Sequence, residues 1–491
     1  MSVCIIGGGL AGIALSINLK MSDLDEEVVL VTDARPSNTR VAGQRFRNRV
    51  AHQTGDRVEQ LEKLFADRNG GVVTDAMKRF ALLSVSELSR WLSLNPADHG
   101  IDLPPLDFDD EPTWFGPQLG RPNEWGNARG FALMQWLSEL AKGLGVRTVQ
   151  GTVTRLSRQA DIIEHVTVQT KQPDGSIGRN LLRADTYVLA GGNPGGALFQ
   201  STNVEIRHSP HELAWEAGLS LTDLDLTMFH ILGNCDRAGA ARVGCFETDV
   251  LDQATIYLRS ASGHFDVLDE ETTHLLAQHQ AHYQFAEISK RFIRHGGVVR
   301  IVFPDQTEKL GRVSHHYSHM GIETHDGFTV AGMRNLFAVG DAAGTGYWCG
   351  HKVRFPGVAL VNCIVGAALV NDAVARRAAA TRAIEWEAVT VDSRNSGPAE
   401  SAMGGRNLKE INTSGLFDFA FGSDPEAGTL AWADALTTVW KRTDGVNPLL
   451  EISLACAFAC HDVASGGWPQ AAIGRSDLVE RVHLHYDASF A

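Results

Sequence analysis

Apolar residues open the chain as a short continuous run over residues 3–6, which stops at a cluster of glycines. A helix-like run then covers residues 13–20, and a second continuous apolar run covers residues 28–31. Short continuous apolar runs are typical of strands buried on both faces, as in a parallel sheet. The pattern therefore predicts a strand, a helix and a parallel strand at the start of an α/β protein.

Strand-like and helix-like patterns continue to alternate over most of the chain. Apolar spacing predicts helices at 54–65, 76–94, 131–144, 211–217, 357–381, 429–440 and 448–463, and strands at 146–149, 151–170, 181–190 and 335–339. A stretch rich in Pro, Gly and Asp, 95–130, predicts loops. Residues 240–304 are more polar and carry one long helical pattern, 270–294, which interrupts the alternation.

These changes in pattern predict how the chain is divided into domains. We expect a doubly wound, Rossmann-like α/β domain made of residues 1–239 and 305–384. An α+β cap domain, 240–304, is expected to be inserted between these two parts. A polar stretch at 392–406 follows, and we expect residues 385–491 to form a helical C-terminal region.

Composition narrows the kind of partner that this chain can bind. The 491 residues include 58 acidic and 44 basic side chains, a formal net charge of −14, which argues against a nucleic-acid or anionic-membrane surface. Seven cysteines, an odd number scattered along the chain, fit a reducing compartment better than a disulfide framework. The first strand begins without a charged and apolar leader, and no apolar stretch has the length of a membrane span. We therefore expect a cytoplasmic protein with neither signal peptide nor membrane anchor.

The glycine cluster after the first strand has the spacing of a dinucleotide-binding turn. Gly7, Gly9 and Gly12 form a Gly-x-Gly-x-x-Gly pattern, and Asp33 follows the second strand about twenty residues further on. Gly7 allows the tight turn, Gly9 lets the backbone approach a pyrophosphate, and Gly12 lets helix and strand pack closely. The helix N-terminus offers backbone N–H groups to phosphates, and the Asp33 carboxylate can accept hydrogen bonds from a ribose.

Two further glycine segments follow predicted strands later in the chain. Ala190-Gly191-Gly192 comes after the strand at 181–190, and Gly340-Asp341 comes after the strand at 335–339. In flavoproteins of this plan, the aspartate of the last segment contacts the ribityl chain and a helix begins near the flavin. The three segments occur in this order, which favours FAD over a nicotinamide cofactor.

The order and local sequence of these segments resemble the succinate dehydrogenase/fumarate reductase flavoprotein family, and within it the L-aspartate oxidase branch most of all. The segments that carry the resemblance are Ser37-Asn38-Thr39, Ala42-Gly43-Gln44, 215–218, 225–230, 316–321 and 340–363. The likeness covers most of residues 1–375, is weak over 240–305 and is lost after 385.

The resemblance implies that FAD is held without a covalent bond, because Asn38 matches the histidine that carries the flavin in the dehydrogenase branch. We expect no metal site. The cofactor-binding residues that follow from the glycine turns and from the resemblance are Gly7, Gly9, Leu10, Ala11, Gly12, Asp33, Ser37, Asn38, Thr39, Gly43, Gln44, Val153, Ala190, Gly191, Gly192, Gly340, Asp341, Gly357, Val358 and Ala359.

For the substrate, the resemblance implies that His230, His316 and Arg354 bind a carboxylate and act in catalysis. Arg offers a planar fork to a carboxylate, and His donates hydrogen bonds or moves a proton. Lys352 competes with Arg354 for this role, because the match there requires a one-residue insertion. Other histidines surround His316 and compete with it, namely His315, His319 and His325.

One departure from the family removes part of the implied chemistry. The cap-domain Arg that transfers a proton to or from the substrate carbon is matched here by Ala286. Arg291, Arg294 and Arg312 are the candidate replacements. Oxidation of a neutral amine by hydride transfer tolerates this loss better than reduction of an alkene does.

We therefore expect an FAD-dependent oxidase or dehydrogenase that oxidises a small amino acid or carboxylate by hydride transfer to flavin N5. Oxygen or another acceptor would reoxidise the flavin. The resemblance favours chemistry similar to that of L-aspartate oxidase, and a tailoring enzyme with a bulkier substrate also fits the short cap. The alternatives are an ene-reductase or desaturase of the fumarate reductase type, a flavin monooxygenase, and a flavoprotein without catalytic activity.

Overall fold

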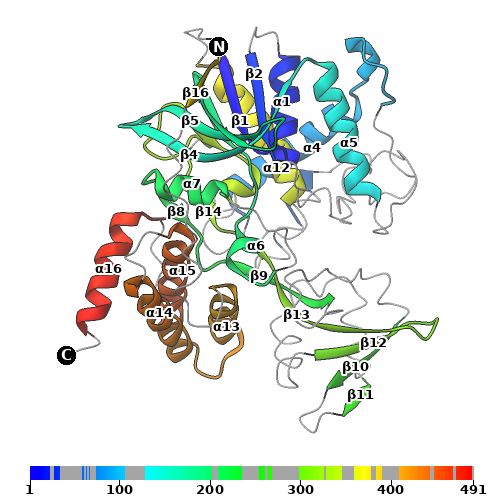
Figure 1. Ribbon diagram of the computed structural model, residues 1–491. Helices are drawn as coiled ribbons and strands as arrows, with labels where there is room; N and C mark the ends of the chain where they lie inside the picture. Colours follow the sequence, from blue (N-terminus) through cyan, green and yellow to red (C-terminus); the bar gives the residue numbers. More distant parts are fainter. Residues whose placement is uncertain are drawn as a thin grey trace. The chain divides into compact units, whose positions relative to one another are not determined.

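The computed structural model of the protein describes residues 1–22, 27–33, 58–59, 62–63, 66, 73–105, 128–201, 208–234, 254–259, 264–267, 298–325, 328–344, 359–377, 383–389, 408–442, 447–467 and 472–488 (Figure 1). The chain divides into two compact units. The first unit comprises Met1–Asn193, His208–Asp223 and Met320–Ser396, and the second comprises Pro194–Arg207, Leu224–His319 and Gly397–Ala491. Each unit is therefore assembled from segments that are far apart in the sequence.

A five-stranded parallel sheet is the core of the first unit. Its strand order is β15 (Leu336–Ala338), β7 (Thr186–Leu189), β1 (Ser2–Ile6), β2 (Glu27–Thr32) and β3 (Arg147–Gln150). Every residue of β1 is buried, as its continuous apolar run predicts. The predicted strand–helix–strand opening is confirmed, with helix α1 (Leu10–Met21) between β1 and β2.

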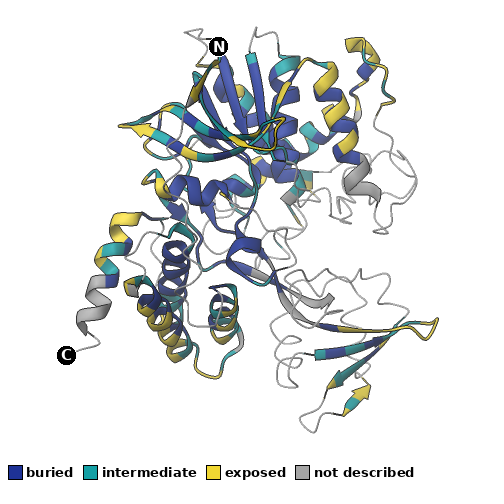
Figure 2. Ribbon diagram, in the orientation of Figure 1, coloured by how far each residue is buried: buried dark blue, intermediate teal, exposed yellow. Residues whose placement is uncertain are grey.

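Helices pack around α1 in this unit. Residues 10–19 of α1 are all buried (Figure 2). Helices α12 (Ala359–Ala375) and α5 (Ala128–Gly143) pack against α1, and α4 (Asp75–Leu92), which the short helix η1 (Pro96–His99) follows, packs against α12. These are the helices that apolar spacing predicted at 357–381, 131–144 and 76–94. The helix expected at 54–65 lies largely outside the described residues.

A four-stranded antiparallel sheet contacts the parallel sheet. Its order is β16 (Glu385–Val389), β6 (Ile177–Arg183), β5 (Ile162–Lys171) and β4 (Thr152–Gln159). The hydroxyl of Tyr187, on β7, lies 3.1 Å from the Glu164 carbonyl oxygen on β5 and accepts a hydrogen bond from the Ala184 N–H at 2.8 Å. The buried Tyr187 side chain therefore joins the two sheets.

Turns divide the strands more finely than the sequence pattern predicts. The expected strand run at 151–170 turns at Ala160, whose φ is 52°. The expected strand at 181–190 breaks between β6 and β7, where Asp185 exchanges hydrogen bonds with Ser2. The Asp185 carboxylate accepts from the Ser2 N–H at 2.9 Å, and the Asp185 N–H donates to the Ser2 hydroxyl at 2.9 Å. This exchange fixes the break beside the first residue of β1.

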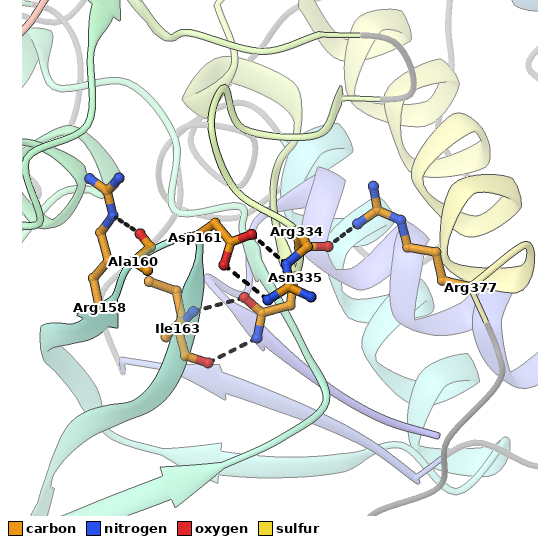
Figure 3. A network of polar contacts seen from close by, with 7 residues as sticks. All are labelled: Arg158, Ala160, Asp161, Ile163, Arg334, Asn335 and Arg377. Atoms are coloured by element: carbon orange, nitrogen blue, oxygen red, sulfur yellow. Dashed lines mark hydrogen bonds and ion pairs between the residues drawn. The ribbon is translucent and has the colours of Figure 1, made fainter.

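A polar network joins the β4–β5 turn to the segment that leads into β15 (Figure 3). Arg334 donates two hydrogen bonds to the Asp161 carboxylate, at 2.5 and 3.0 Å. The Asn335 side chain accepts from the Ile163 N–H and donates to the Ile163 carbonyl, each at 2.8 Å. Arg377, past the end of α12, donates to the Arg334 carbonyl. This network lies where β15 begins, so it holds the end of the parallel sheet opposite to the glycine turns.

A short helix, α7 (Pro210–Glu216), and a pair of antiparallel strands, β8 (Leu221–Thr222) and β14 (Gly321–Ile322), also belong to the first unit. The Ser209 hydroxyl caps α7 by accepting from the Glu212 N–H, and the Glu212 carboxylate accepts from the Ser209 N–H. This reciprocal capping satisfies N–H groups at the start of the helix and explains why the predicted helix at 211–217 forms.

The second unit contains a five-stranded antiparallel sheet. Its order is β11 (Phe265–Val267), β10 (Thr255–Arg259), β12 (Val298–Val302), β13 (Glu308–Ser318) and β9 (Thr227–Asn234). Strands β10, β11 and β12 come from the segment 240–304 that was expected to form the cap. The long helix expected at 270–294 lies outside the described residues.

Helices from the C-terminal part of the chain belong to the same unit. They are α13 (Leu408–Phe421), α14 (Pro425–Arg442), α15 (Pro448–Ala464) and α16 (Arg475–Ala488), with the short strand β17 (Ala472–Ile473) before α16. The helices predicted at 429–440 and 448–463 are confirmed as α14 and α15, whereas α13 and α16 were not predicted. No helix in the described ranges combines the length and hydropathy needed to cross a bilayer.

Candidate functional site

Three glycine segments that the sequence singled out meet at one edge of the parallel sheet. Strands β15, β7 and β1 are neighbours, and each ends in one of these segments. Backbone hydrogen bonds join their ends: the Ala190 N–H donates to the Ile6 carbonyl at 2.8 Å, and the Val339 N–H donates to the Leu189 carbonyl at 2.9 Å. The carboxyl edge of a parallel sheet is where α/β proteins bind nucleotides. The structure therefore brings the predicted glycine turns together at the expected edge.

The glycines in these turns are needed because the backbone leaves no room for a side chain. Gly7 has φ of 119°, and a Cβ atom there would lie 2.5 Å from the Ala190 carbonyl carbon. A Cβ atom at Gly12 would lie 2.0 Å from the Gly7 carbonyl oxygen. Gly340 has φ of 63°, and a Cβ atom there would lie 2.8 Å from the Cβ of Ala11. Because these glycines have no side chain, the start of α1 can lie directly against the two other turns.

The N-terminus of α1 is suited to an anion. Its N-cap is Gly9, which offers no side-chain hydrogen bond, and no acidic residue stands in its first turn. By contrast, Thr74 caps α4 and Ser209 caps α7 with a hydroxyl oxygen. The helix dipole and backbone N–H groups at the start of α1 therefore face no competing side chain of their own helix. The predicted residues Leu10, Ala11 and Gly12 form this first turn and are buried.

Asp33 lies next to this edge, directly after β2, and is half-buried. The Gly151 N–H donates to the Thr32 carbonyl at 2.9 Å, which places the start of β4 beside the end of β2. Val153, predicted to contact the cofactor, lies on β4 with a buried side chain and pairs with Val168. Its side chain is therefore part of the interior, and a contact with the cofactor stays a prediction.

Asp341 follows the third turn in the short helix η3 (Gly340–Ala342) and is half-buried. The buried Cys363, on α12, packs beside Gly340. Burial raises the pKa of the Cys363 thiol well above its ordinary value, and the nearby Asp341 raises it further, so the thiol stays neutral. Asp341 therefore lies beside a neutral thiol at this edge.

Several predicted cofactor and substrate residues lie outside the described part of the chain. They are Ser37, Asn38, Thr39, Gly43, Gln44, Lys352, Arg354, Gly357 and Val358. Ala359 is described as the first residue of α12. Of the proposed replacements for the missing cap Arg, Arg291 and Arg294 also lie outside, whereas Arg312 is placed on β13 opposite Gly233.

The two predicted catalytic histidines occupy neighbouring strands of the second unit. His230 is on β9 and pairs with Ser314 on β13. His316 falls at a shift in register of β13, between the pairs His315–Phe229 and Tyr317–Met228. Such a β-bulge inserts an extra residue and re-aims side chains, and bulges are frequent beside active sites. The fold thus brings the backbones of His230 and His316 together, although they are 86 positions apart (316 − 230).

Two of the histidines that compete with His316 for this role have different surroundings. His315 is fully buried, with its Nδ1 atom 2.8 Å from the Ser201 hydroxyl and its ring stacked on Phe199 at 4.6 Å. Burial and, to a smaller extent, the proximity of His319 together lower the pKa of His315 to about 3, so His315 is neutral. His325 is exposed. The sequence alone did not distinguish the buried His315 from the other histidines near it.

Sequence reasoning missed the residues that surround His315. Phe199 and Ser201 belong to no motif, and the segment that holds them, which follows helix α6 (Gly195–Leu198), carries no charge. The contact depends on a pairing between residues 114 positions apart. The chain offers no local signal for such a contact.

No protein-family model matches this chain, and no curated protein matches it in sequence. Solved structures do match it in fold. Quinol fumarate reductase from E. coli matches with a TM-score of 0.61 and 15% identity, covering 95% of this chain and 88% of the other. The Sdh1 complex of Mycobacterium smegmatis matches with a TM-score of 0.61 and 17% identity, covering 94% and 86%. A quinol–fumarate reductase structure with menaquinol molecules matches with a TM-score of 0.59 and 15% identity, covering 94% and 89%.

These matches cover most of this chain and most of each matched chain. At such identities they establish the architecture and leave the activity to the site itself. The chain therefore has the fold of the succinate dehydrogenase/fumarate reductase flavoproteins.

Proposed function

We propose that this protein is an FAD-dependent oxidoreductase that holds its cofactor without a covalent bond. The observation that carries the proposal is the meeting of three glycine turns at the carboxyl ends of adjacent parallel strands, beside a helix N-terminus that no side chain caps. A Cβ atom at Gly7, Gly12 or Gly340 would clash with a neighbouring turn or helix, so these glycines are needed for the turns to meet. The fold shared with fumarate reductase structures supports the same cofactor.

Residues of the first unit would hold FAD by its phosphates and sugars. Gly9 and the first turn of α1 would offer backbone N–H groups to the pyrophosphate, whereas the Gly7 N–H donates to the Val31 carbonyl and holds the turn on β2. Asp33 accepts hydrogen bonds from the adenosine ribose, and Asp341 accepts them from the ribityl chain. Bound FAD supplies a two-electron acceptor for hydride at N5.

The proposed substrate is a small amino acid or carboxylate. His230 and His316 stand close together on β9 and β13, and a pair of imidazole donors suits a carboxylate. Arg354, outside the described residues, would add a guanidinium fork to the same carboxylate. The bulge at His316 supports this role, because it sets that residue apart from the regular strand pairing.

Oxidation at a carbon that bears an amine fits these residues better than reduction of an alkene. In amine oxidation the substrate loses a hydride from Cα and a proton from nitrogen, and an imine forms. The nitrogen proton can pass to water or a His, so no side chain has to add a proton to carbon. Ala286 stands where the family places an Arg for that task. We therefore propose chemistry similar to that of L-aspartate oxidase, with oxygen or another acceptor receiving the electrons.

Reduction of an activated alkene, such as an unsaturated dicarboxylic acid, is the second candidate. The names of the matched structures, which are fumarate reductases, favour it. This reaction needs a group that delivers a proton to carbon. Arg312 is the candidate whose backbone the structure describes, on β13 opposite Gly233 and four positions before His316.

Anaerobic mixing of the purified protein with a panel of substrates tests these proposals. The panel contains L-aspartate, other amino acids, succinate and aromatic amino acids, and the visible absorbance of flavin is followed. Bleaching by an amino acid, with peroxide formed when air is admitted, is the expected result. Bleaching by dithionite that only an unsaturated acid reverses would favour the second candidate. A protein isolated without any flavin would contradict both.

A further inference from the structure

A buried polar contact in the second unit is not used by the proposed chemistry. His315 and Ser201 are 0% and 2% exposed, and the Nδ1 atom of His315 lies 2.8 Å from the Ser201 hydroxyl oxygen. The backbones of the two residues also form an isolated parallel bridge. Buried polar side chains are costly unless they form hydrogen bonds, so this contact fixes the orientation of the imidazole.

Aromatic rings hold the same imidazole on two sides. Phe199 stacks on His315, with ring centroids 4.6 Å apart and planes inclined by 27°. Phe229 meets it edge-on, with centroids 6.5 Å apart and planes inclined by 80°. Phe229 is the residue directly before His230 on β9, and His315 is the residue directly before His316 on β13. The packed imidazole therefore touches the neighbour of one candidate catalytic histidine and is itself the neighbour of the other.

We propose that His315 is a positioning residue for the substrate-binding histidines: its hydrogen bond to Ser201 sets the bulge in β13 from which His316 is presented beside His230. This inference rests on the proposed function and deepens it. A bulge interrupts the regular ladder, so its conformation needs contacts from outside the two strands. The bond to Ser201 and the stack on Phe199 are such contacts, and both come from the segment that follows α6.

The C-terminal helix α13 in turn fixes that segment. The Asn412 amide donates to the Leu198 carbonyl at 2.9 Å, and the Thr413 hydroxyl accepts from the Gln200 N–H at 2.9 Å. On the same helix, Phe417 meets Phe229 edge-on at 5.3 Å. A chain of contacts therefore runs from α13 through residues 198–201 to His315, and it gives the C-terminal helices a part in shaping the proposed substrate site.

The hydrogen bond and the packing can be separated by substitution. In Ser201→Ala the imidazole keeps its aromatic neighbours but loses its hydroxyl partner. In the double variant Ser201→Ala/His315→Phe both polar groups are removed and an aromatic ring remains. Replacing both partners of a buried hydrogen bond by apolar groups is close to neutral for stability, so the double variant is expected to melt near the wild-type temperature.

The expected kinetic result is a loss of kcat/KM in both variants, while flavin content stays at the wild-type level. Misplacement of a reacting group by about 1 Å lowers rates on the order of 100-fold, and a loss of 10- to 100-fold is expected here. A merely structural role predicts that activity returns in the double variant together with stability. Recovery of wild-type kcat/KM in the double variant would therefore overturn the proposal.

A second measurement does not depend on finding the substrate. Nitrogen-15 spectra of the histidine rings are recorded for the wild type and both variants, with the signals of His316 assigned from His316→Gln. The proposal expects the ring signals of His316 to move in Ser201→Ala and to stay moved in the double variant. Unchanged His316 signals would overturn the proposal. Failure of every substrate to bleach the flavin would refute the proposed function alone, because this spectrum would still report the bulge.

Discussion

Single glycines determine how closely the three turns of the first unit approach one another. A Cβ atom at Gly12 would lie 2.0 Å from the Gly7 carbonyl oxygen, whereas one at Gly332 would meet nothing within 4 Å. Gly332 has φ of 71°, so it resists substitution through backbone strain and not through contact. Comparing the two glycines therefore separates closure of the proposed FAD site from general loss of stability.

Gly12→Ala is expected to yield protein without flavin, because α1 must move away from the Gly7 turn. Overpacking of this kind also costs about 1–3 kcal/mol of unfolding free energy. Gly332→Ala is the control, with a strain cost of about 1–2 kcal/mol and full flavin content expected. Flavin released by denaturation is measured against protein concentration, with urea unfolding alongside. Wild-type flavin content in Gly12→Ala would refute the assignment of this turn.

Buried neutral histidines are expected to make the fold less stable in mild acid. Burial lowers the pKa of His211 to about 4 from its ordinary 6.5, although its Nε2 atom lies 3.1 Å from the Met320 carbonyl oxygen. Between these values the unfolded chain binds a proton that the folded chain does not, so stability falls as pH decreases from 6.5 towards 4. The full effect is on the order of 3 kcal/mol.

The measurement is urea unfolding of wild type and His211→Gln over this pH range. The variant is expected to show a shallower decline, because the titrating group is gone. Burial raises the pKa of the neighbouring Glu212, which adds a slope of opposite sign at the acid end, so the difference between the two proteins is the quantity to compare. Parallel curves for both proteins would contradict a neutral buried His211.

At the scale of elements, local pattern accounts for some helices and strands but not for others. The strand–helix–strand opening and α14 and α15 follow from apolar spacing. Helix α13 contains Asn412, Thr413, Ser414 and Gly415, residues that favour caps and turns in isolation, and it was not predicted. Contacts with other segments stabilise this helix. Gly415 lies so close to α14 that a Cβ atom there would be 2.1 Å from the Trp432 ring. Asn412 and Thr413 form hydrogen bonds with the backbone of residues 198 and 200.

In the candidate site too, local sequence pattern predicts some features and not others. The glycine turns were predicted because each glycine has a local backbone task, and the parallel sheet then brings them together. The burial of His315 could not be predicted, since one residue of register determines the face of the strand on which a side chain lies. A shift in strand pairing depends on contacts with residues such as Ser201, more than a hundred positions away.

In the polar network at the start of β15, two neighbouring residues are expected to contribute differently to the free energy of unfolding. Asn335→Ala would leave the N–H and carbonyl of the buried Ile163 without their side-chain partner, at a cost of about 1–3 kcal/mol. Arg334→Ala removes an exposed ion pair that water screens, so its loss is expected to cost less than that of the Asn335 side chain. Urea unfolding compares the two, and flavin content is expected to stay unchanged in both, because the glycine turns lie at the other ends of the strands. A larger loss in Arg334→Ala would contradict this ranking.

At the scale of the whole molecule, the candidate cofactor residues and the candidate substrate residues lie in different units, and each unit is made of several segments of the chain. The glycine turns and Asp341 belong to the first unit, and His230 and His316 belong to the second. The second unit also includes the C-terminal helices, among which the buried Asn412 side chain forms several hydrogen bonds. Its amide donates to the Leu198 carbonyl and the Ser453 hydroxyl, and its oxygen accepts from the Trp432 indole at 3.2 Å.

Asn412→Leu is therefore expected to weaken the second unit selectively. The substitution leaves buried partners unsatisfied, each at about 1–3 kcal/mol. Because compact units of one chain can unfold separately, calorimetry is expected to show a transition that moves to lower temperature while flavin release, followed by fluorescence, keeps its wild-type midpoint. Thr438→Ala, on the exposed side of α14, is the control and should change neither. If flavin release moved down together with the transition, the two units would form one cooperative body, and the substrate histidines could not be altered without disturbing the proposed cofactor site.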